Sequence, residues 1–309
     1  MEHVGALPAV ARHRPRDLFG PDWALGWLFT APALVGILGL IAYPFVQSII
    51  YSLQNVRVGG EAIWVGLANY QSLLVGTNSG GFVNSLQVTF VYLVAALAAK
   101  FALGLVSALI LHAKIRLRSL FRVLLFLPWA IPGVVGAQAW RWIYDDTFGV
   151  INLALFQIGL IERPLLFLAK PDLALWSVVA ASVWQGTPFW TMSYLAGLQS
   201  IPRDLYEAAE IDGASTWQSF WLITLPSLMP IVTITFMLSA IWTTNSVQYV
   251  YILTSGGPAH ATETFPMFAL IQGLRVYDLG MAAAVPLLVA PPFAVLICLL
   301  SRRMLRQDA

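Results

Sequence analysis

The chain has little charge. Only 10% of its 309 residues are Asp, Glu, Lys or Arg, and 59% are hydrophobic, whereas about 25% of a typical soluble domain is charged. With 17 basic and 15 acidic side chains, the chain cannot cover the surface of a soluble globule of this length. The mean hydropathy of +0.75 agrees. These values exclude an ordinary soluble domain and predict an integral membrane protein.

Residues suited to metal or disulfide chemistry are also scarce. Cys298 is the single cysteine, so no internal disulfide or multi-cysteine metal site can form. Its apolar neighbours in sequence predict a small buried hydrophobe. The four histidines are far apart and match no zinc motif such as HExxH. A net charge of +2, with the basic residues spread along the chain, gives no case for nucleic-acid binding.

What the chain has is long apolar stretches. A spanning helix needs about 20 mainly apolar residues. Residues 23–56 carry no charge, a stretch too long for the apolar core of a cleavable signal peptide. Further stretches follow, which predicts an all-α integral membrane fold with six transmembrane helices. They are expected at Leu25–Ile49, Val83–Leu111, Leu120–Trp140, Leu173–Leu198, Leu228–Leu253 and Gly280–Leu300.

The distribution of basic residues sets the expected orientation. Roughly twice as many Lys and Arg residues fall on the side of the N-terminus as on the other, and the positive-inside rule makes that side cytoplasmic. Both termini are therefore expected in the cytoplasm. This predicts a cytoplasmic arm (residues 1–22), one transmembrane domain (residues 23–303) and a cytoplasmic tail (residues 304–309).

Three connections are expected outside the membrane, over residues 53–82, 141–172 and 254–279. Each is rich in aromatic residues rather than plainly polar. Such segments are typical of short helices at the membrane interface, where aromatic rings lie between lipid and water.

The connection between the fourth and fifth predicted spans has a different composition. From Gln199 to Pro226 it carries four acidic residues and one basic residue, Arg203, so it does not serve as a positive-inside anchor. Pro202 can open a helix, and Gly213 allows a turn with positive φ. A second helix is expected to follow and to end near Leu225–Pro226. We call residues 199–227 the elbow, because the pattern predicts a helix–turn–helix that projects from the membrane.

Several motifs now give a family resemblance. Residues 207–226, EAAEIDGASTWQSFWLITLP, resemble the EAA loop of ABC-importer permeases. Three further parts of the chain are similar to elements of sugar permeases. They are Gly66–Tyr70 (GLANY), Leu253–Pro258 (LTSGGP) with Thr-Glu-Thr at 262–264, and Arg122 with Leu127, Pro128 and Trp140. The resemblance covers residues 25–301, and the chain is most similar to MalF/UgpA-like carbohydrate permeases.

The resemblance implies a function and a set of partners. It implies the permease subunit of an ATP-driven, binding-protein-dependent sugar importer, located in the bacterial or archaeal cytoplasmic (inner) membrane. The implied partners are membrane lipid, a second homologous permease subunit, a cytoplasmic ABC ATPase dimer and an extracytoplasmic sugar-binding protein. The chain has no GxxxxGK[ST] motif, so ATP and Mg are expected on the partner ATPase, with no cofactor and no enzyme activity here. The residues implied to couple to the ATPase are Glu207, Ala208, Ala209, Asp212, Gly213, Leu225 and Pro226.

A second group of residues is a candidate substrate pathway. Sugar rings need hydrogen bonds at their edges and aromatic faces for stacking, and polar and aromatic residues gather in the fourth and fifth predicted spans. Interhelical hydrogen bonding is an equally open explanation. Related permeases often carry an acid shortly before LTxGGP, where this chain has Gln248, so substrate preference cannot be copied from them. The candidates are Gln185, Trp190, Asn245, Gln248 and Tyr249.

Lys100 is the most unusual ionisable residue within a predicted span, because it falls near the middle of Val83–Leu111. Such a group is a functional candidate by default, and Lys100 could face a translocation cavity. The structural alternative, in which it pairs with a backbone carbonyl or a partner subunit and tolerates methionine, is favoured by the sequence. Two other functions were weighed. A secondary active transporter would need carboxylates within the spans, and an enzyme acting on lipid-linked sugars would need clustered acids, for which Asp145 and Asp146 are the adjacent pair.

Overall fold

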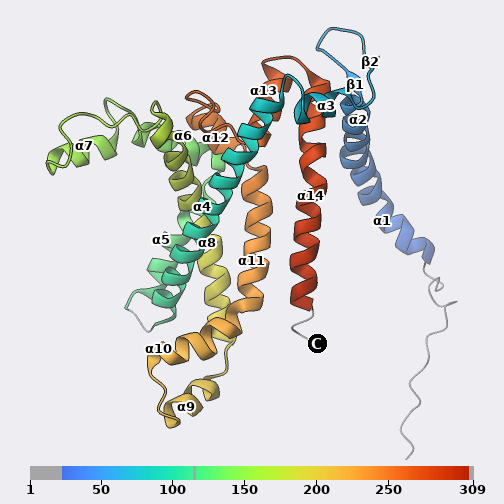
Figure 1. The fold of residues 1–309 in the computed structure, drawn as a ribbon. Coiled ribbons are helices and arrows are strands. Elements are labelled where there is room, and N and C mark those ends of the chain that lie inside the picture. The colour runs from blue at the N-terminus through green and yellow to red at the C-terminus, as the bar shows by residue number, and fades with distance from the viewer. Residues whose placement is uncertain (1–22, 114–115, 306–309) are drawn as a thin grey trace, which may run out of the picture. The chain divides into compact units, whose positions relative to one another are not determined.

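The computed structural model describes residues 23–113 and 116–305, and the regular structure in these ranges is almost entirely helical (Figure 1). The exception is a short antiparallel pair, β1 (Gln54–Asn55) and β2 (Ile63–Trp64), in which Gln54 lies opposite Trp64. The expected arm (residues 1–22), residues 306–309 of the expected tail and the side chain of Cys298 lie outside what the structure describes. The helical content confirms the all-α fold class.

The chain divides into two units, residues 1–50 and 51–309. In the first, α1 (Trp23–Ile37) continues through the π-helical turn η2 (Leu38–Ala42) into α2 (Tyr43–Ser52). Residues 25–52 form an apolar helical segment of 28 residues, which is long enough to cross a membrane.

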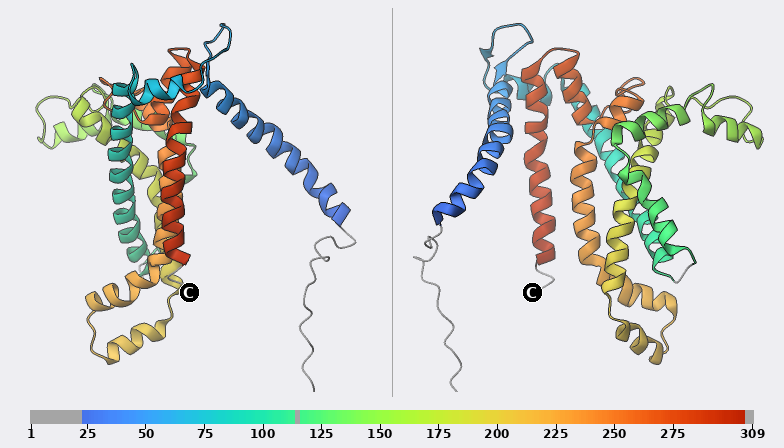
Figure 2. Two further views of the ribbon diagram at one scale, coloured as in Figure 1. Left: turned by 45° about the vertical axis from the view of Figure 1, so that its right-hand side comes forward. Right: turned by 180° about the vertical axis from the view of Figure 1, so that it is seen from behind.

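The second unit is built around two long helices, α4 (Ser79–His112) and α8 (Pro171–Ser200), which pack along each other (Figure 2). Gly104 permits their close approach, because a Cβ added there would lie 2.5 Å from Cβ of Trp190. Next to these helices runs α11 (Leu225–Asn245), and the three share an apolar core. Buried members of this core are Leu97, Ala108, Trp190, Tyr194 and Leu228.

The predicted third span is not one helix. The structure has α5 (Arg118–Ala130) and α6 (Gly133–Ile143), which meet at an angle of 96°. Pro132 lacks the backbone N–H needed to continue α5, and it disfavours helical geometry in the preceding residue. Ile131 accordingly has the extended dihedral angles φ −76° and ψ 130°. The expectation of a single helix over Leu120–Trp140 was wrong for this reason.

The predicted fifth span is also interrupted. The helix α11 ends at Asn245, Ser246 is extended (φ −79°, ψ 110°), and α12 (Gln248–Leu253) begins two residues later. The most polar stretch of the predicted span thus falls at a break between two helices.

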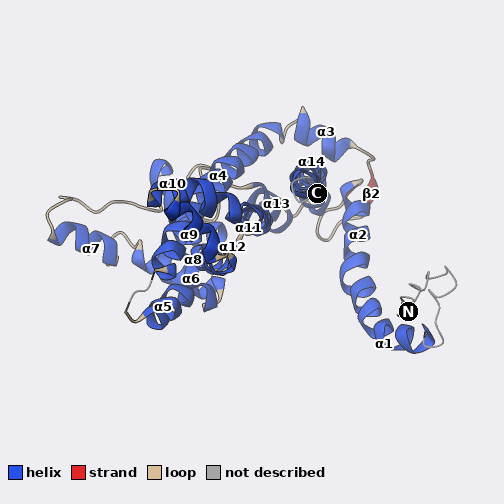
Figure 3. Ribbon diagram, turned by 90° about the horizontal axis from the view of Figure 1, so that it is seen from below, coloured by secondary structure: helices blue, strands red, loops and turns tan. Residues whose placement is uncertain are grey.

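Short helices occur in all three connections expected outside the membrane. They are α3 (Ala68–Leu74), α7 (Val150–Gln157) and α13 (Phe265–Leu274). Seen along the bundle, α7 extends away from α5 and α8, whereas α13 lies beside the last helix, α14 (Leu279–Leu305) (Figure 3). The expected helices in these connections are confirmed.

Length and composition identify fewer spans than the six predicted. Among the described residues, three helical segments are long and apolar enough to cross a membrane, residues 25–52, 79–112 and 216–253, and the bent pair α5 and α6 would make a fourth. The described apolar part of α14, Leu279–Val295, is shorter, and α8 carries many polar residues.

Candidate functional site

The elbow forms the helix–turn–helix that the sequence predicts. Its first arm is α9 (Arg203–Ile211), which begins after Pro202, and its second begins with α10 (Thr216–Ser219). A reciprocal pair of hydrogen bonds starts α10: the Ser215 backbone N–H donates to Oε1 of Gln218 at 2.8 Å, and the Gln218 backbone N–H donates to Oγ of Ser215 at 3.3 Å. In the second unit, α9 and α10 lie at the end opposite to α12 and α13 (Figure 1).

Gly213 makes the turn between the two arms. Its φ is +78°, a left-handed geometry that glycine adopts without steric cost. The backbone N–H of Ala214 donates to the carbonyl of Ala209 at 2.9 Å, and that of Gly213 donates to the carbonyl of Glu210 at 3.1 Å. These bonds satisfy carbonyls at the end of α9. A Cβ added at Gly213 would meet no atom within 4 Å, so the requirement for glycine comes from the backbone alone.

The sequence predicts that the second arm ends near Leu225–Pro226, and the structure differs. The arm passes through the π-helical turn η3 (Phe220–Thr224) into α11 without a break. Pro226 has no backbone N–H to donate, and the π-helical turn lies directly before it. The Leu225 N–H donates to the carbonyl of Phe220, five residues earlier, which keeps the chain helical through the proline.

The elbow has an uncovered outer surface. Glu207, Ala208 and Asp212 are exposed, and the large apolar side chains of Ile211 and Trp217 are 87% and 69% exposed. On the inner side, the hydroxyls of Tyr206 and Thr224 share a hydrogen bond of 2.9 Å that holds the two arms together. Of the other implied coupling residues, Ala209 and Leu225 are half-buried and Pro226 is exposed.

A polar pocket of about 240 Å³ lies among the helices of the second unit. Lys100 of α4 is 4% exposed, and its Nζ donates to Oγ1 of Thr243 at 2.9 Å. Gln185 of α8 donates from Nε2 to the carbonyl of Ile131 at 3.1 Å, at the bend between α5 and α6. The full lining is Lys100, Trp129, Ser182, Gln185, Gly186, Phe189, Ser239, Trp242, Thr243, Ser246, Gln248 and Tyr249.

Three of the five predicted pathway residues line this pocket: Gln185, Gln248 and Tyr249. The other two do not. Trp190 is fully buried in the helical core, where its Nε1 donates to Oγ of Ser239 at 3.0 Å. Asn245 is exposed, and its Nδ2 donates to the carbonyl of Ile241 in its own helix at 2.8 Å. Trp190 therefore has a packing role in this structure.

Lys100 has a hydrogen-bond partner within the chain that the sequence did not predict. Its partner is a side-chain hydroxyl of the same chain, Thr243, rather than a backbone carbonyl. The spacing of Ser239 and Thr243 could have indicated this, because residues four apart lie on one helical face. That face of α11 supplies hydroxyls to the pocket.

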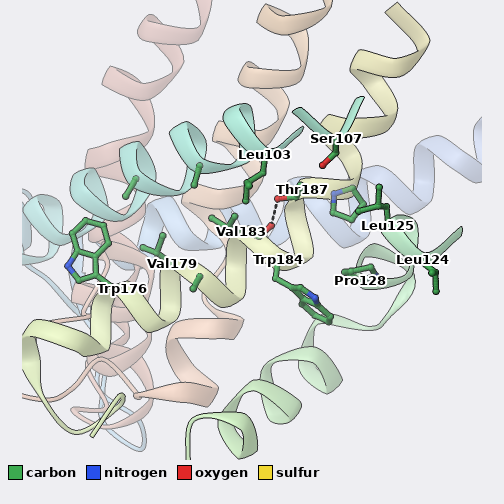
Figure 4. A pocket seen from close by; sticks show the side chains of 14 residues that line it. Leu103, Ser107, Leu124, Leu125, Pro128, Trp176, Val179, Val183, Trp184 and Thr187 are labelled. Atoms are coloured by element: carbon green, nitrogen blue, oxygen red, sulfur yellow. Dashed lines mark hydrogen bonds between the residues drawn. The ribbon is translucent and has the colours of Figure 1, made fainter. Parts of the chain in front are cut away.

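A larger pocket of about 750 Å³, between α4, α5 and α8, is almost entirely apolar (Figure 4). It is lined by Leu103 and Ser107 of α4, Leu124 and Leu125 of α5, and residues of α8 that include Val183. The Thr187 hydroxyl donates to the Val183 carbonyl at 2.7 Å, so it offers no free donor to an occupant. A sugar would lose hydrogen bonds here, and the smaller polar pocket suits it better.

Catalytic and metal sites gain no support. Among the described residues, no three His, Cys, Asp or Glu side chains lie close enough to hold a metal ion. Asp145, of the adjacent acidic pair, accepts hydrogen bonds at Oδ1 from the backbone N–H groups of Phe148 and Thr147. These bonds lower the pKa of Asp145, so it is a loop-capping carboxylate and not a poised general acid.

Comparison with known proteins decides the family. The model of the "Binding-protein-dependent transport system inner membrane component" family matches residues 100–306. The chain belongs to this family. It is the permease component of a binding-protein-dependent ABC importer, a multi-pass protein of the inner membrane, and in this family the ATPase is a separate subunit. The secondary-transporter and membrane-enzyme alternatives are thereby set aside.

Two relatives illustrate the sequence similarity. The trehalose/maltose transport system permease protein MalF of Thermococcus litoralis is 36% identical over 263 residues, which cover 84% of this chain and 88% of the relative. The inner membrane ABC transporter permease protein YcjO of Escherichia coli is 32% identical over 267 residues, covering 85% of this chain and 88% of YcjO.

Solved structures show the same fold. A permease chain of a bacterial ABC transporter that imports the acidic polysaccharide alginate superimposes with a TM-score of 0.81 at 22% identity, covering 95% of this chain and 99% of that one. The alginate transporter in complex with a periplasmic protein bound to alginate pentasaccharide gives a TM-score of 0.80 at 22% identity, over 94% and 98% of the two chains. At this identity the likeness concerns the fold alone.

Proposed function

We propose that this permease imports a carbohydrate and that the polar pocket is part of its substrate pathway. The observation that carries the proposal is the gathering of two amides, several hydroxyls and aromatic rings in one pocket within an apolar bundle. Amides and hydroxyls hydrogen-bond the edges of a sugar ring, and aromatic faces pack on its CH groups. The similar proteins support this class of cargo, because one belongs to a trehalose/maltose transport system and another to an importer of alginate.

The proposed topology has six membrane-crossing segments with both termini in the cytoplasm. The bent pair α5 and α6 counts as one crossing, and α8 and α14 complete the set. In the second unit, the C-terminal end of α14 lies at the same end as α9 and α10 (Figure 1). Together with the bias in basic residues, this supports a cytoplasmic position for the elbow.

The elbow is proposed to dock on a cytoplasmic ATPase dimer. The exposed carboxylate of Glu207 can make charge-assisted contacts with the ATPase, and Ala208 and Ala209 allow its surface to approach closely. Asp212 and Gly213 shape the turn, whereas Leu225 and Pro226 lie where the second arm enters α11. Because η3 and α11 continue the second arm without a break, movement of the docked elbow would reach the helix that carries Thr243.

The complete importer is proposed to contain a second, homologous permease and an extracytoplasmic sugar-binding protein. The alginate transporter has been solved with its periplasmic binding protein bound. The two permeases would each supply half of the pathway, and the ATPase dimer would hold ATP and Mg. Alternation between inward-facing and outward-facing states requires only that nucleotide and sugar-loaded binding protein favour different states by a few kcal/mol.

Uptake of radiolabelled sugars by the reconstituted complex tests the proposal. A panel of maltose, trehalose and an oligouronate would identify a carbohydrate that is transported only with ATP and the binding protein. The double variant Gln185→Leu with Gln248→Leu should lose this uptake while keeping the complex assembled. Transport of a non-carbohydrate solute, with every sugar excluded, would contradict the proposal.

A further inference from the structure

A second polar pocket lies at the elbow end of the bundle and is separate from the substrate pocket. It has a volume of about 330 Å³, where the end of α4, the start of α5, the end of α8 and the start of α9 meet. Its lining residues are His112, Arg118, Leu198, Gln199, Ile201, Arg203 and Tyr206. Two arginines and a histidine line it, and no carboxylate does.

The positive charge of this pocket has no counter-charge in the described parts of the chain. Within those residues the pair of His260 and Glu263 is the one ion pair, so neither Arg118 nor Arg203 forms an ion pair with a carboxylate there. Arg118 is half-buried, and an arginine in that position keeps a strong attraction for anions, because the surrounding protein screens its charge less than water does.

Hydrogen-bond donors of the pocket are also incompletely used. The side-chain oxygen of Gln199, oriented toward the arginines, accepts from Nη2 of Arg118 at 3.2 Å and from Nη2 of Arg122 at 3.0 Å. The Nε atoms of both arginines are buried without an acceptor. A neutral amide oxygen therefore joins two guanidinium groups, whose planar arrays of donors match the oxygens of a phosphate.

The apolar pocket is formed by other residues of α4 and α5, between one and two turns from the residues of these helices that line the charged pocket. Arg122 precedes Leu124 and Leu125 by less than one turn of α5, and these leucines line the apolar pocket with Leu103 and Ser107 of α4 (Figure 4). On the outside of α5, large apolar side chains such as Leu120 and Phe121 are about half exposed. A charged pocket thus lies next to an apolar cavity large enough for part of an acyl chain.

We propose that these two neighbouring pockets bind an anionic phospholipid, with its phosphate among Arg118, Arg122 and Arg203 and an acyl chain in the apolar cavity. The cytoplasmic leaflet is rich in anionic lipids that attract basic side chains near the membrane surface. Only the choice of leaflet depends on the topology proposed above. Since Arg203 belongs to the elbow and Arg118 to the bundle, the headgroup would connect the two.

The amount of lipid that the complex retains tests the proposal directly. The complete importer is reconstituted in phosphatidylcholine nanodiscs with or without phosphatidylglycerol, and phosphatidylglycerol bound per complex is counted by native mass spectrometry. The triple variant Arg118→Gln, Arg122→Gln, Arg203→Gln should bind phosphatidylglycerol about tenfold more weakly, because charge-assisted bonds to the phosphate are lost. Arg141→Gln and Arg163→Gln, at the other end of the second unit, should bind it as the wild type does.

Two further variants test the headgroup site and the acyl-chain site separately. Arg203→Gln alone changes an exposed residue of α9 and leaves the bundle intact, and it should weaken phosphatidylglycerol binding in part. Ala180→Phe, which fills the apolar pocket, should weaken binding without changing any charge. Wild-type retention of phosphatidylglycerol by the triple variant would overturn the site. Displacement of the lipid by inorganic phosphate, with no effect of Ala180→Phe, would assign the pocket to a free anion and overturn the lipid.

Discussion

The Nζ atom of Lys100 on α4 donates a hydrogen bond of 2.9 Å to Oγ1 of Thr243 on α11. The two residues are 143 positions apart in sequence, and the bond joins the helix next to α8 to the helix that continues from the elbow. Lys100 is buried, yet it lines the polar pocket with Gln185 and Gln248. The ammonium group is therefore a candidate contact for substrate as well as a contact between helices.

Replacing Lys100 with methionine is expected to lower sugar uptake about tenfold while the complex still assembles. The change keeps the length of the side chain but removes a hydrogen bond from a charged donor, which is worth about 1.5–3 kcal/mol. Uptake is measured in proteoliposomes and divided by the amount of complex recovered. Lys170→Met, at an exposed position before α8, is the matched control. Wild-type uptake by Lys100→Met would return this lysine to a purely structural role.

Gln248 and Asn245 are expected to differ, although the sequence groups them together. Gln248 lines the pocket, so Gln248→Leu should reduce the apparent affinity for sugar by about 2- to 10-fold, the value of one ordinary hydrogen bond. The amide of Asn245 bonds its own helix outside the pocket, and Asn245→Leu should change the affinity little. Concentration-dependent uptake distinguishes the two variants. Equal losses would mean that both side chains reach the substrate.

Gly104→Ala is expected to lower the thermal stability of the purified permease. The added Cβ would lie 2.5 Å from Cβ of Trp190, an atom too close to the backbone to move aside, and such overpacking costs about 1–3 kcal/mol. Gly80→Ala makes the same change in the same helix, where a Cβ meets nothing within 4 Å. The control should melt at or above the wild-type temperature. A melting temperature unchanged by Gly104→Ala would contradict the close packing of α4 on α8.

Gly213→Leu is expected to weaken binding of the ATPase subunits without preventing membrane insertion. At a φ of +78°, a leucine is strained by about 1–3 kcal/mol, whereas asparagine tolerates this geometry better. Gly213→Asn should therefore retain most of the ATPase in co-purification. If leucine and asparagine behave alike, the turn geometry is not what matters for docking.

The sequence predicts features that depend on local chemistry and misses those that depend on packing. The turn at Gly213 and the start of α9 after Pro202 follow from residue type, and the structure has both. The bend at Pro132 measures 96°, which is sharper than the kink that a proline within an apolar stretch predicts. Trp190 differs from its predicted place in the pathway, because residue type alone does not tell a core tryptophan from one that lines a pocket.

The central claim is that the elbow couples this permease to ATP hydrolysis. Glu207→Lys reverses the charge of an exposed side chain on α9 and should leave insertion and pairing with the second permease intact. The decisive measurement is binding-protein-stimulated ATPase activity together with sugar uptake, in the same reconstituted vesicles, with Glu162→Lys in the connection before α8 as the exposed control. The account predicts that Glu207→Lys loses uptake, and either loses stimulated hydrolysis or hydrolyses ATP without transport, whereas the control keeps both. Wild-type ATPase activity and wild-type uptake in Glu207→Lys would contradict it.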